Sequence, residues 1–268
     1  MGLAGNARYL LSPVLAGLLL SVADIRLLLV LDIATFFLTV TTTLIVRNHL
    51  DSQVEKKDTS YLEDLKAGWQ CVTGNHGLFI LVLMSSLMTL FVGSIQILCE
   101  PMILDFTTSM VLGTLETICA MGMLVSGIYV GFKGIKKEHR KALCLSLCGS
   151  GIAMLFFGAT TNLPVIVISG FFFFAMLPFA NSCLDYLVRV HIPDELQGRA
   201  WGVIGFISQL GYVVAYALFG VAADTVASLT GLPVGRGAGI TIMISGLILC
   251  LVALLLYRNK EVAELEKH

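Results

Sequence analysis

The sequence predicts an all-α, polytopic integral membrane protein with about eight transmembrane helices and both termini inside. The first observation is composition: of 268 residues, 57% are hydrophobic and 13% are charged, and the mean hydropathy is +0.89. Soluble domains usually carry about a quarter charged residues, so this composition excludes an ordinary cytosolic enzyme and a disordered chain. The net charge of −1 provides no basic face, which argues against a nucleic-acid partner.

The second observation is a series of long apolar runs. A membrane-crossing helix needs roughly 20 mostly apolar residues. Eight runs approach or exceed that length, at residues 9–23, 27–46, 78–99, 108–132, 142–160, 163–187, 201–223 and 238–257. The first run is short, contains Pro13 and also resembles a signal peptide. Because a second apolar run follows within a few residues, we interpret the first run as a span.

The third observation is the distribution of basic residues between these runs. With both termini inside, fifteen of the 17 Lys and Arg residues fall in inside segments, and only Arg26 and Arg236 fall outside. Such an excess of positive charge on one side is characteristic of cytoplasmic loops. It predicts the orientation and a multi-pass location in the cell membrane, where lipid is one partner.

The inside segment 48–77 predicts a linker that contains an amphipathic helix. Ser60 and Glu63 have the spacing of a capping box. One face of the predicted helix carries four apolar residues, Leu62, Leu65, Trp69 and Val72. This face suits either a helix on the membrane surface or a helix packed on the inner loops.

Carboxylates inside the spans are the first candidates for function, because charge at membrane depth is costly. Glu116 lies about eight residues into the fourth span, roughly 12 Å from its outer end. A carboxyl group removed from water can hold a proton, since desolvation disfavours its charged form. Glu116 is therefore a candidate proton carrier, with Asp32 and Asp185 next. Alternatively, Glu116 faces a water-filled cavity or binds the hydroxyl of Thr114 or Thr117.

Small residues and inner turns give further candidates. Gly127 and Gly131 are one helical turn apart, which favours close approach of another helix. Pro193 and Glu195 suit the start of a helical turn, so this inner segment is a gate element or a well-capped turn. No span carries a nucleophile with a nearby His, and no Cys pair has the spacing of a zinc site. The sequence thus predicts no enzyme, no catalytic residues, no metal site and no cofactor.

Four segments carry a resemblance to a known family. Residues 12–17 (Ser-Pro-Val-Leu-Ala-Gly) resemble the Pro/Gly motif in the fifth helix of the major facilitator superfamily, and residues 32–36 (Asp-Ile-Ala-Thr-Phe) resemble the opening of its sixth. Gly127 and Gly131, with the basic cluster of Lys133, Lys136, Lys137 and Arg140, resemble its inner-loop motif, without the usual Asp. Residues 192–199 (Ile-Pro-Asp-Glu-Leu-Gln-Gly-Arg) resemble the loop before its eleventh helix. The likeness is greatest to bacterial proton-driven drug exporters of the macrolide-efflux type.

The resemblance implies that the eight spans are helices five to twelve of a twelve-helix transporter. The domains are then two helices that end an N-terminal bundle (1–47), a cytoplasmic linker (48–77), a six-helix C-terminal bundle (78–257) and a cytoplasmic tail (258–268). It also implies inner-gate residues, namely Gly127, Gly131, Lys136, Lys137, Arg140, Pro193, Glu195, Gly198 and Arg199.

The expected function is proton-coupled export of a hydrophobic or cationic drug-like solute by alternating access at the bacterial plasma membrane. Helices one to four of such a transporter are missing from this sequence. They are expected either on another chain or in a self-associated form of this one. A different hypothesis is a truncated or split fragment without independent transport, because missing helices leave polar groups without partners.

Overall fold

The computed structural model describes residues 25–50, 61–135 and 138–266. The chain divides into two compact units, Met1–Ser60 and Tyr61–His268, and each is described by itself. The predicted first span, the capping residue Ser60, and the gate candidates Lys136 and Lys137 lie outside the described residues.

The first unit contains one described helix, α2 (Ile25–Leu50), which corresponds to the predicted second span. Its apolar centre is Leu29–Ile45. Five threonine hydroxyls in α2 each donate a hydrogen bond to a backbone carbonyl one turn earlier (Thr35, Thr39, Thr41, Thr42 and Thr43). A run of threonines therefore remains compatible with an apolar medium, because every one of these hydroxyl protons has an acceptor.

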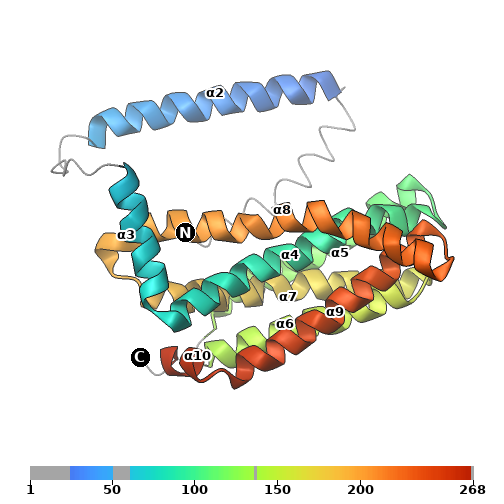
Figure 1. Cartoon of the computed structure of the whole chain (residues 1–268). Coiled ribbons are helices and arrows are strands. Elements are labelled where there is room, and N and C mark those ends of the chain that lie inside the picture. The colour runs from blue at the N-terminus through green and yellow to red at the C-terminus, as the bar shows by residue number, and fades with distance from the viewer. Residues whose placement is uncertain (1–24, 51–60, 136–137, 267–268) are drawn as a thin grey trace. The chain divides into compact units, whose positions relative to one another are not determined.

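The second unit is a bundle of six helices, each long and apolar enough to cross a membrane. They are α4 (His76–Leu104), α5 (Ser109–Lys133), α6 (His139–Ala159), α7 (Leu163–Val190), α8 (Gln197–Thr230) and α9 (Val234–Arg258). The described residues contain no strand. The prediction of an all-α polytopic protein is confirmed, and all six predicted spans of this region are helices (Figure 1).

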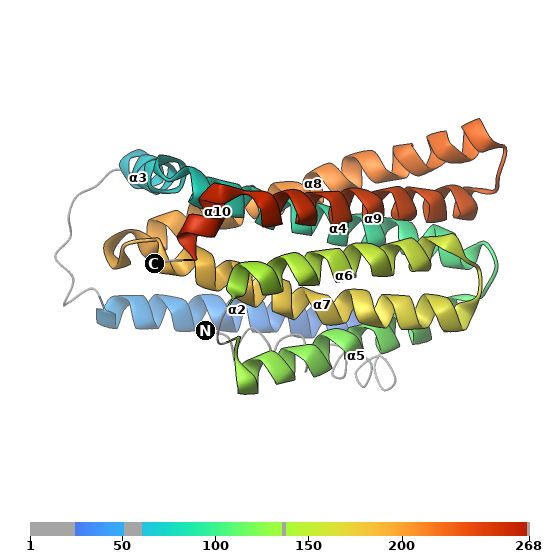
Figure 2. The same ribbon diagram turned by 90° about the horizontal axis from the view of Figure 1, so that it is seen from below.

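Two helices form one side of this bundle and four form the other. α6 packs on both α9 and α7, and α9 also packs on α4 and α8. α4 pairs mainly with α8, and α5 packs mainly on α7. Figures 1 and 2 show the result: α6 and α9 lie on one side, and α4, α5, α7 and α8 form the opposite side.

Glycines let α6 and α9 approach each other closely. A Cβ added at Gly151 would lie 2.6 Å from the Gly246 carbonyl oxygen, and one added at Gly158 would collide with the Gly239 carbonyl oxygen. Without side chains at these positions the two backbones touch, which is how apolar helices associate when hydrophobic driving force is absent. The seam between α6 and α9 is therefore rigid and tightly packed.

Local signals account for several helix boundaries. The Asn75 side chain accepts a hydrogen bond from the Leu78 amide at 3.2 Å and caps α4. Pro164 lies in the first turn of α7, where its missing N–H costs nothing. α8 ends at Gly231, whose φ of +67° suits glycine.

The connection between the predicted spans 201–223 and 238–257 is much shorter in the structure. α8 continues to Thr230 and α9 begins at Val234, so the prediction is wrong at both ends. The apolar pattern ends at Asp224, but the backbone hydrogen bonds of a helix do not require apolar side chains. The helix therefore extends beyond the apolar run until Gly231.

Three short elements cover the predicted inner end of the bundle: α3 (Tyr61–Gly74), the 3-10 turn η1 (Asp194–Leu196) and α10 (Lys260–Leu265). α3 packs on α8 and buries Gly68 and Val72, whereas Leu62, Leu65 and Trp69 are exposed. The four apolar residues of α3 therefore do not share one environment. Val72 contributes to packing on the bundle, while the other three face outward.

Candidate functional site: a polar face on one side of the bundle

The exposed side chains on α6 and α9 are apolar throughout the middle of both helices. They are Leu145, Ile152, Phe156, Ile244, Leu247, Ile248, Leu251, Leu254 and Leu255. Polar exposed residues of these two helices occur only at their ends, at Lys141, Tyr257 and Arg258. This apolar surface has the character of a lipid contact, since hydrocarbon offers no partner to polar groups.

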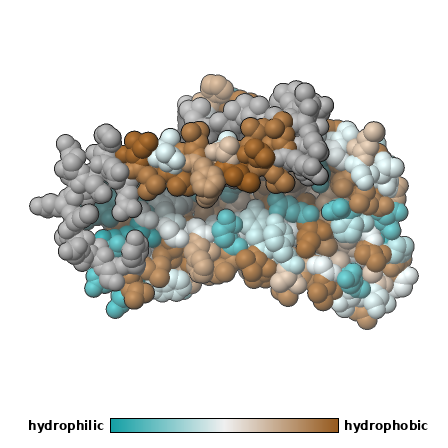
Figure 3. Space-filling model, turned by 90° about the horizontal axis from the view of Figure 1, so that it is seen from above, coloured by the Kyte–Doolittle hydropathy of each residue, from teal (hydrophilic) through white to brown (hydrophobic). Residues whose placement is uncertain are grey.

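The other four helices expose polar side chains well inside their spans. These are Gln96 and Glu100 on α4, Glu116 and Thr117 on α5, Asn181 and Asp185 on α7, and Gln209 and Tyr216 on α8. Figure 3, seen from the top of Figure 1, shows hydrophilic residues along this side. We call these eight residues the polar face. Membrane proteins keep such groups towards protein or water, so this side is the candidate functional surface.

Hydrogen bonds join α4 and α8 at the polar face. The Tyr216 hydroxyl donates to Gln96 Oε1 at 2.8 Å. Closer to the inner end, the Ser85 and Ser208 hydroxyls contact each other and the Thr89 hydroxyl donates to the Ser208 carbonyl. These contacts form an uncharged polar strip between the two helices.

Aromatic rings adjoin this strip. The Tyr212 and Tyr216 rings lie with centroids 6.0 Å apart, and Gln209 is exposed on the same face of α8, since seven residues make almost two helical turns. The strip therefore offers amide, hydroxyl and aromatic contacts side by side. The sequence analysis missed Gln96, Gln209 and Tyr216 because it considered only residues with a charged side chain. An amide or phenol inside an apolar run would have identified them.

Glu116 is exposed on α5 and belongs to the polar face. The Thr114 and Thr117 hydroxyls donate to the Met110 and Gly113 carbonyls at 2.9 and 2.8 Å. Their protons are used within the helix, so the interpretation in which either hydroxyl binds the Glu116 carboxylate is wrong. The side chain of Glu116 instead points away from the packed core, with Leu115 and Cys119 buried beside it.

The other two candidate carboxylates are in different positions. Asp185 is exposed near the predicted inner end of α7, one turn after Asn181. Asp32 lies on α2, in the separate first unit, where it is exposed. The structure thus places Glu116 and Asp185 on the same bundle, and it describes Asp32 only within its own helix.

The predicted glycine contact at Gly127 and Gly131 does not occur within the described residues. A Cβ added at Gly127 would meet no atom within 4 Å, and Gly131 is exposed. The close approach of α5 and α7 occurs instead at Gly122, where an added Cβ would collide with the Phe171 carbonyl oxygen. The four-residue spacing therefore did not identify the contact, since Gly122 has no glycine four residues away.

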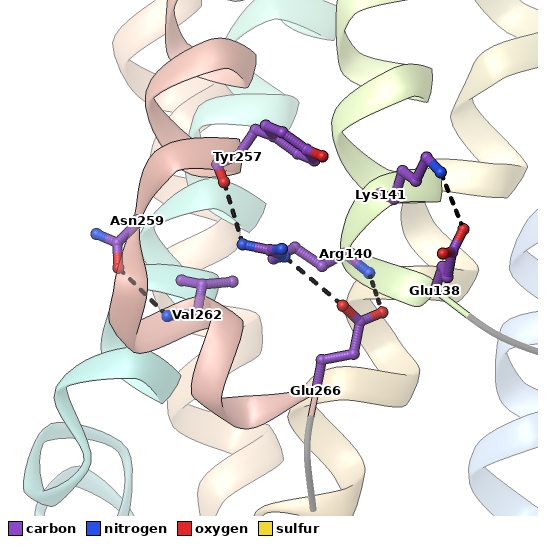
Figure 4. A network of polar contacts seen from close by, with 7 residues as sticks. All are labelled: Glu138, Arg140, Lys141, Tyr257, Asn259, Val262 and Glu266. Atoms are coloured by element: carbon purple, nitrogen blue, oxygen red, sulfur yellow. Dashed lines mark hydrogen bonds and ion pairs between the residues drawn. The ribbon is translucent and has the colours of Figure 1, made fainter.

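Arg140, a gate candidate, binds the C-terminal segment (Figure 4). Its guanidinium lies 3.6 Å from a Glu266 carboxylate oxygen, donates to the Tyr257 carbonyl at 3.1 Å and stacks on the Tyr257 ring. Glu266 also accepts a hydrogen bond from the Arg140 backbone amide at 3.1 Å, so its negative charge lies at the positive end of α6. The same figure shows Lys141 paired with Glu138.

Arg199, another gate candidate, binds the linker helix. Its guanidinium lies 2.8 Å from the Asp64 carboxylate of α3. Pro193 precedes the turn η1 that contains Glu195, in agreement with the prediction of a helical turn there. Gly198 is exposed and has open space around it.

The fold defines a polytopic helical membrane protein with polar side chains exposed on one side of its bundle. A family model of the Major Facilitator Superfamily matches residues 1–216. The chain therefore belongs to this superfamily and is a multi-pass protein of the cell membrane, as the sequence motifs predicted. No solved structure matches the chain.

Two curated relatives extend the comparison. Macrolide efflux protein A of Streptococcus pyogenes is 24% identical over 269 residues, which cover 96% of this chain and 62% of the relative. Macrolide efflux protein A of Enterococcus faecalis is 26% identical over 213 residues, which cover 75% of this chain and 64% of the relative. The chain thus spans less than two thirds of these relatives' length. Its correspondence to helices five to twelve stays a prediction.

Proposed function

We propose that this chain acts as a transporter that exports hydrophobic or cationic solutes across the cell membrane. The observation that carries the proposal is the polar face, which combines membrane-depth carboxylates with amide and aromatic groups on one side of the bundle. The names of the relatives support export of macrolides or similar solutes. Transport would use alternating access, in which the solute site faces each side of the membrane in turn.

The charge of the polar face favours a cationic solute. In the six spans of the bundle, every described Lys and Arg lies within three residues of a helix end. Glu100, Glu116 and Asp185 lie deeper. Asp185 has Arg189 one turn further along α7, whereas no described Lys or Arg of these spans lies at the depth of Glu116. A protonated amine would supply that charge, and the Tyr212 and Tyr216 rings would hold its apolar part through aromatic and cation–π contacts.

Glu116 is the residue proposed to exchange a proton for the solute. It is the deepest carboxylate on the polar face, at the eighth position of α5. Bound solute cation and bound proton would then compete for one carboxylate, which couples their movement in opposite directions. Asp185 and Asp32 are the next candidates for this role.

Efflux measurements in drug-sensitive bacteria test the proposal. Expression of the chain should raise macrolide resistance and accelerate efflux of a cationic dye, compared with cells that hold an empty vector. Membrane fractionation verifies that the protein is present. Unchanged resistance and unchanged efflux at verified membrane expression would contradict export by this chain and favour the inactive-fragment hypothesis.

The proton-coupling role needs its own variant. Glu116→Gln keeps the size and polarity of the side chain but removes its titration, so the dependence of efflux on external pH should disappear. Glu100→Gln, also on the polar face but closer to the end of its helix, is the matched control and should retain the pH dependence. A wild-type pH profile for Glu116→Gln would exclude this residue as the proton carrier.

A further inference from the structure

An apolar groove runs along the outside of the bundle between α6 and α7. Its volume is about 490 Å³. Gly149, Ile152 and Phe156 line it from α6, and Val165, Phe172 and Met176 line it from α7. Phe156 and Phe172 are about half exposed, at 57% and 53%, so they form open walls that face the surroundings of the protein.

The groove faces away from the polar face. On α7, Phe172 precedes Asn181 by nine residues, which at 3.6 residues per turn places the two side chains on opposite sides of the helix. The apolar surface of α6 continues directly into the groove through Ile152 and Phe156. The groove is therefore part of the membrane-facing surface and is separate from the candidate transport surface.

The chemistry of the groove suits a hydrocarbon. Its one hydroxyl, on Ser169, already donates to the Val165 carbonyl at 2.6 Å. Gly149 leaves the floor open, since an added Cβ would come within 3.3 Å of Met176 Sδ. No side chain lining the groove offers a charged or free polar contact, so an occupant gains only apolar burial and dispersion there.

The length of the groove matches one leaflet of a bilayer. From Val165 to Met176 it spans eleven residues of α7, about 16 Å at 1.5 Å per residue. The hydrocarbon core of a bilayer is about 30 Å thick, so each leaflet contributes roughly 15 Å. The groove begins two residues after the start of α7, at the end of the bundle that the basic residues predict to be outside.

A cation lies at that end. The Arg236 guanidinium, from α9, donates to the Ala159 carbonyl at 3.4 Å, and Ala159 is three residues from Phe156. Arg236 is one of only two Lys or Arg residues that the sequence predicts outside. A positive charge close to the mouth of an apolar groove fits a molecule with a phosphate at one end and a hydrocarbon chain at the other.

We propose that the α6–α7 groove binds one acyl chain of an outer-leaflet phospholipid, with the lipid phosphate near Arg236. This bound lipid fills the surface between α6 and α7 and leaves the polar face free. The site does not depend on the proposed export function, because it lies on the opposite face of α7.

A tryptophan reporter tests the site in the full chain. The natural residues Trp69 and Trp201 are replaced by Phe, and Phe172→Trp places a single Trp in the groove. Ile244→Trp, on the exposed face of α9 at a similar depth, is the matched control outside this groove. Each variant is reconstituted with a phospholipid brominated in its acyl chain and then transferred into unbrominated detergent.

The groove site predicts that the Trp at position 172 stays quenched after transfer, while the Trp at position 244 loses its quenching. Gly149→Leu should remove the retained quenching by filling the floor, and Arg236→Gln should weaken it. Equal loss of quenching at positions 172 and 244 would overturn the proposal. Displacement of the brominated lipid by a macrolide would also overturn it, since the groove would then belong to the solute. The position 172 and 244 comparison remains decisive even if Gly149→Leu does not fold.

Discussion

The two sides of the six-helix bundle differ in what their exposed side chains can contact. The middle of the α6–α9 side exposes only apolar side chains, whereas α4, α5, α7 and α8 expose carboxylates, amides and phenols in addition to apolar side chains. α9 has the highest mean hydropathy of the six helices and α5 and α8 have the lowest, while α6 is less hydropathic than α4 and α7. The difference shows that a few polar residues, placed on one face of each helix, are enough to separate a lipid-facing side from a candidate solute-facing side.

Glycines at close helix contacts occur on both sides of the bundle. Gly158 and Gly239 bring the backbones of α6 and α9 together, and Gly211 brings α8 against the Ser86 carbonyl of α4, while Gly202 and Gly205 on α8 have no atom within 4 Å of an added Cβ. The seam between α6 and α9 is closely packed along its length, whereas part of the α8 surface has room around it. We interpret α6 and α9 as the rigid scaffold and the polar face as the surface exposed to changing contacts.

The largest expected effect comes from adding a charge to each side. Leu247→Arg, close to the centre of α9, should destabilise the protein in the membrane by about 3 kcal/mol, the cost of an arginine in the centre of a membrane helix. Gln209→Arg on the polar face should cost much less, because the new charge lies beside other polar groups. Membrane expression and thermal unfolding of both variants measure the difference. Equal losses would abolish the distinction between the sides.

Replacing a glycine at a close helix contact by alanine should have the next largest effect on stability. Gly158→Ala forces a methyl group into the Gly239 carbonyl, which should reduce the free energy of unfolding by about 2 kcal/mol. Gly205→Ala meets open space and should be neutral or slightly stabilising, since alanine is the better helix former. Thermal unfolding in detergent compares the pair. A stable Gly158→Ala variant would show that the seam can open.

The sequence predicts the spans of the bundle but not the contacts between them. Apolar runs predicted the six spans, because a membrane-crossing helix needs only sufficient length and hydropathy. The same runs could not say which glycine meets a neighbour: Gly127 fitted the spacing, yet Gly122 makes the contact. Nor could they say that Val72 is buried while Leu62 of the same helix is exposed, because that depends on how α3 packs on α8.

Only part of the candidate site was predicted, because the rest depends on contacts between helices. Glu116 was identified because a carboxylate inside a span is unusual on its own. Gln96 and Tyr216 become notable only when the fold brings α4 and α8 together, 120 residues apart in the chain. Arg140 was assigned to a gate by its motif, and its contact with Glu266 depends on where α10 returns to the bundle.

The contact between Arg140 and Glu266 gives a third, smaller prediction about the scaffold side. Glu266→Gln should lower the free energy of unfolding by about 1 kcal/mol, because it weakens charge-assisted bonds to the guanidinium and to the α6 backbone. If Arg140 acts mainly within the scaffold, Arg140→Gln added to Glu266→Gln should cost little more. Additive losses in a double-mutant cycle would contradict this coupling. An altered efflux rate at unchanged stability would favour the gate role.

The smallest effect on stability is expected at the polar face itself. Tyr216→Phe removes the hydrogen bond to Gln96, but both side chains are exposed, so the free energy of unfolding should change by less than about 0.5 kcal/mol. Efflux should nevertheless change in its preference among cationic dyes, because the phenol and the freed amide lie where the solute is proposed to bind. Tyr257→Phe, at the end of α9, is the control and should leave that preference unaltered. A polar face that tolerates Tyr216→Phe in both measurements would be an exposed surface without a role in solute selection.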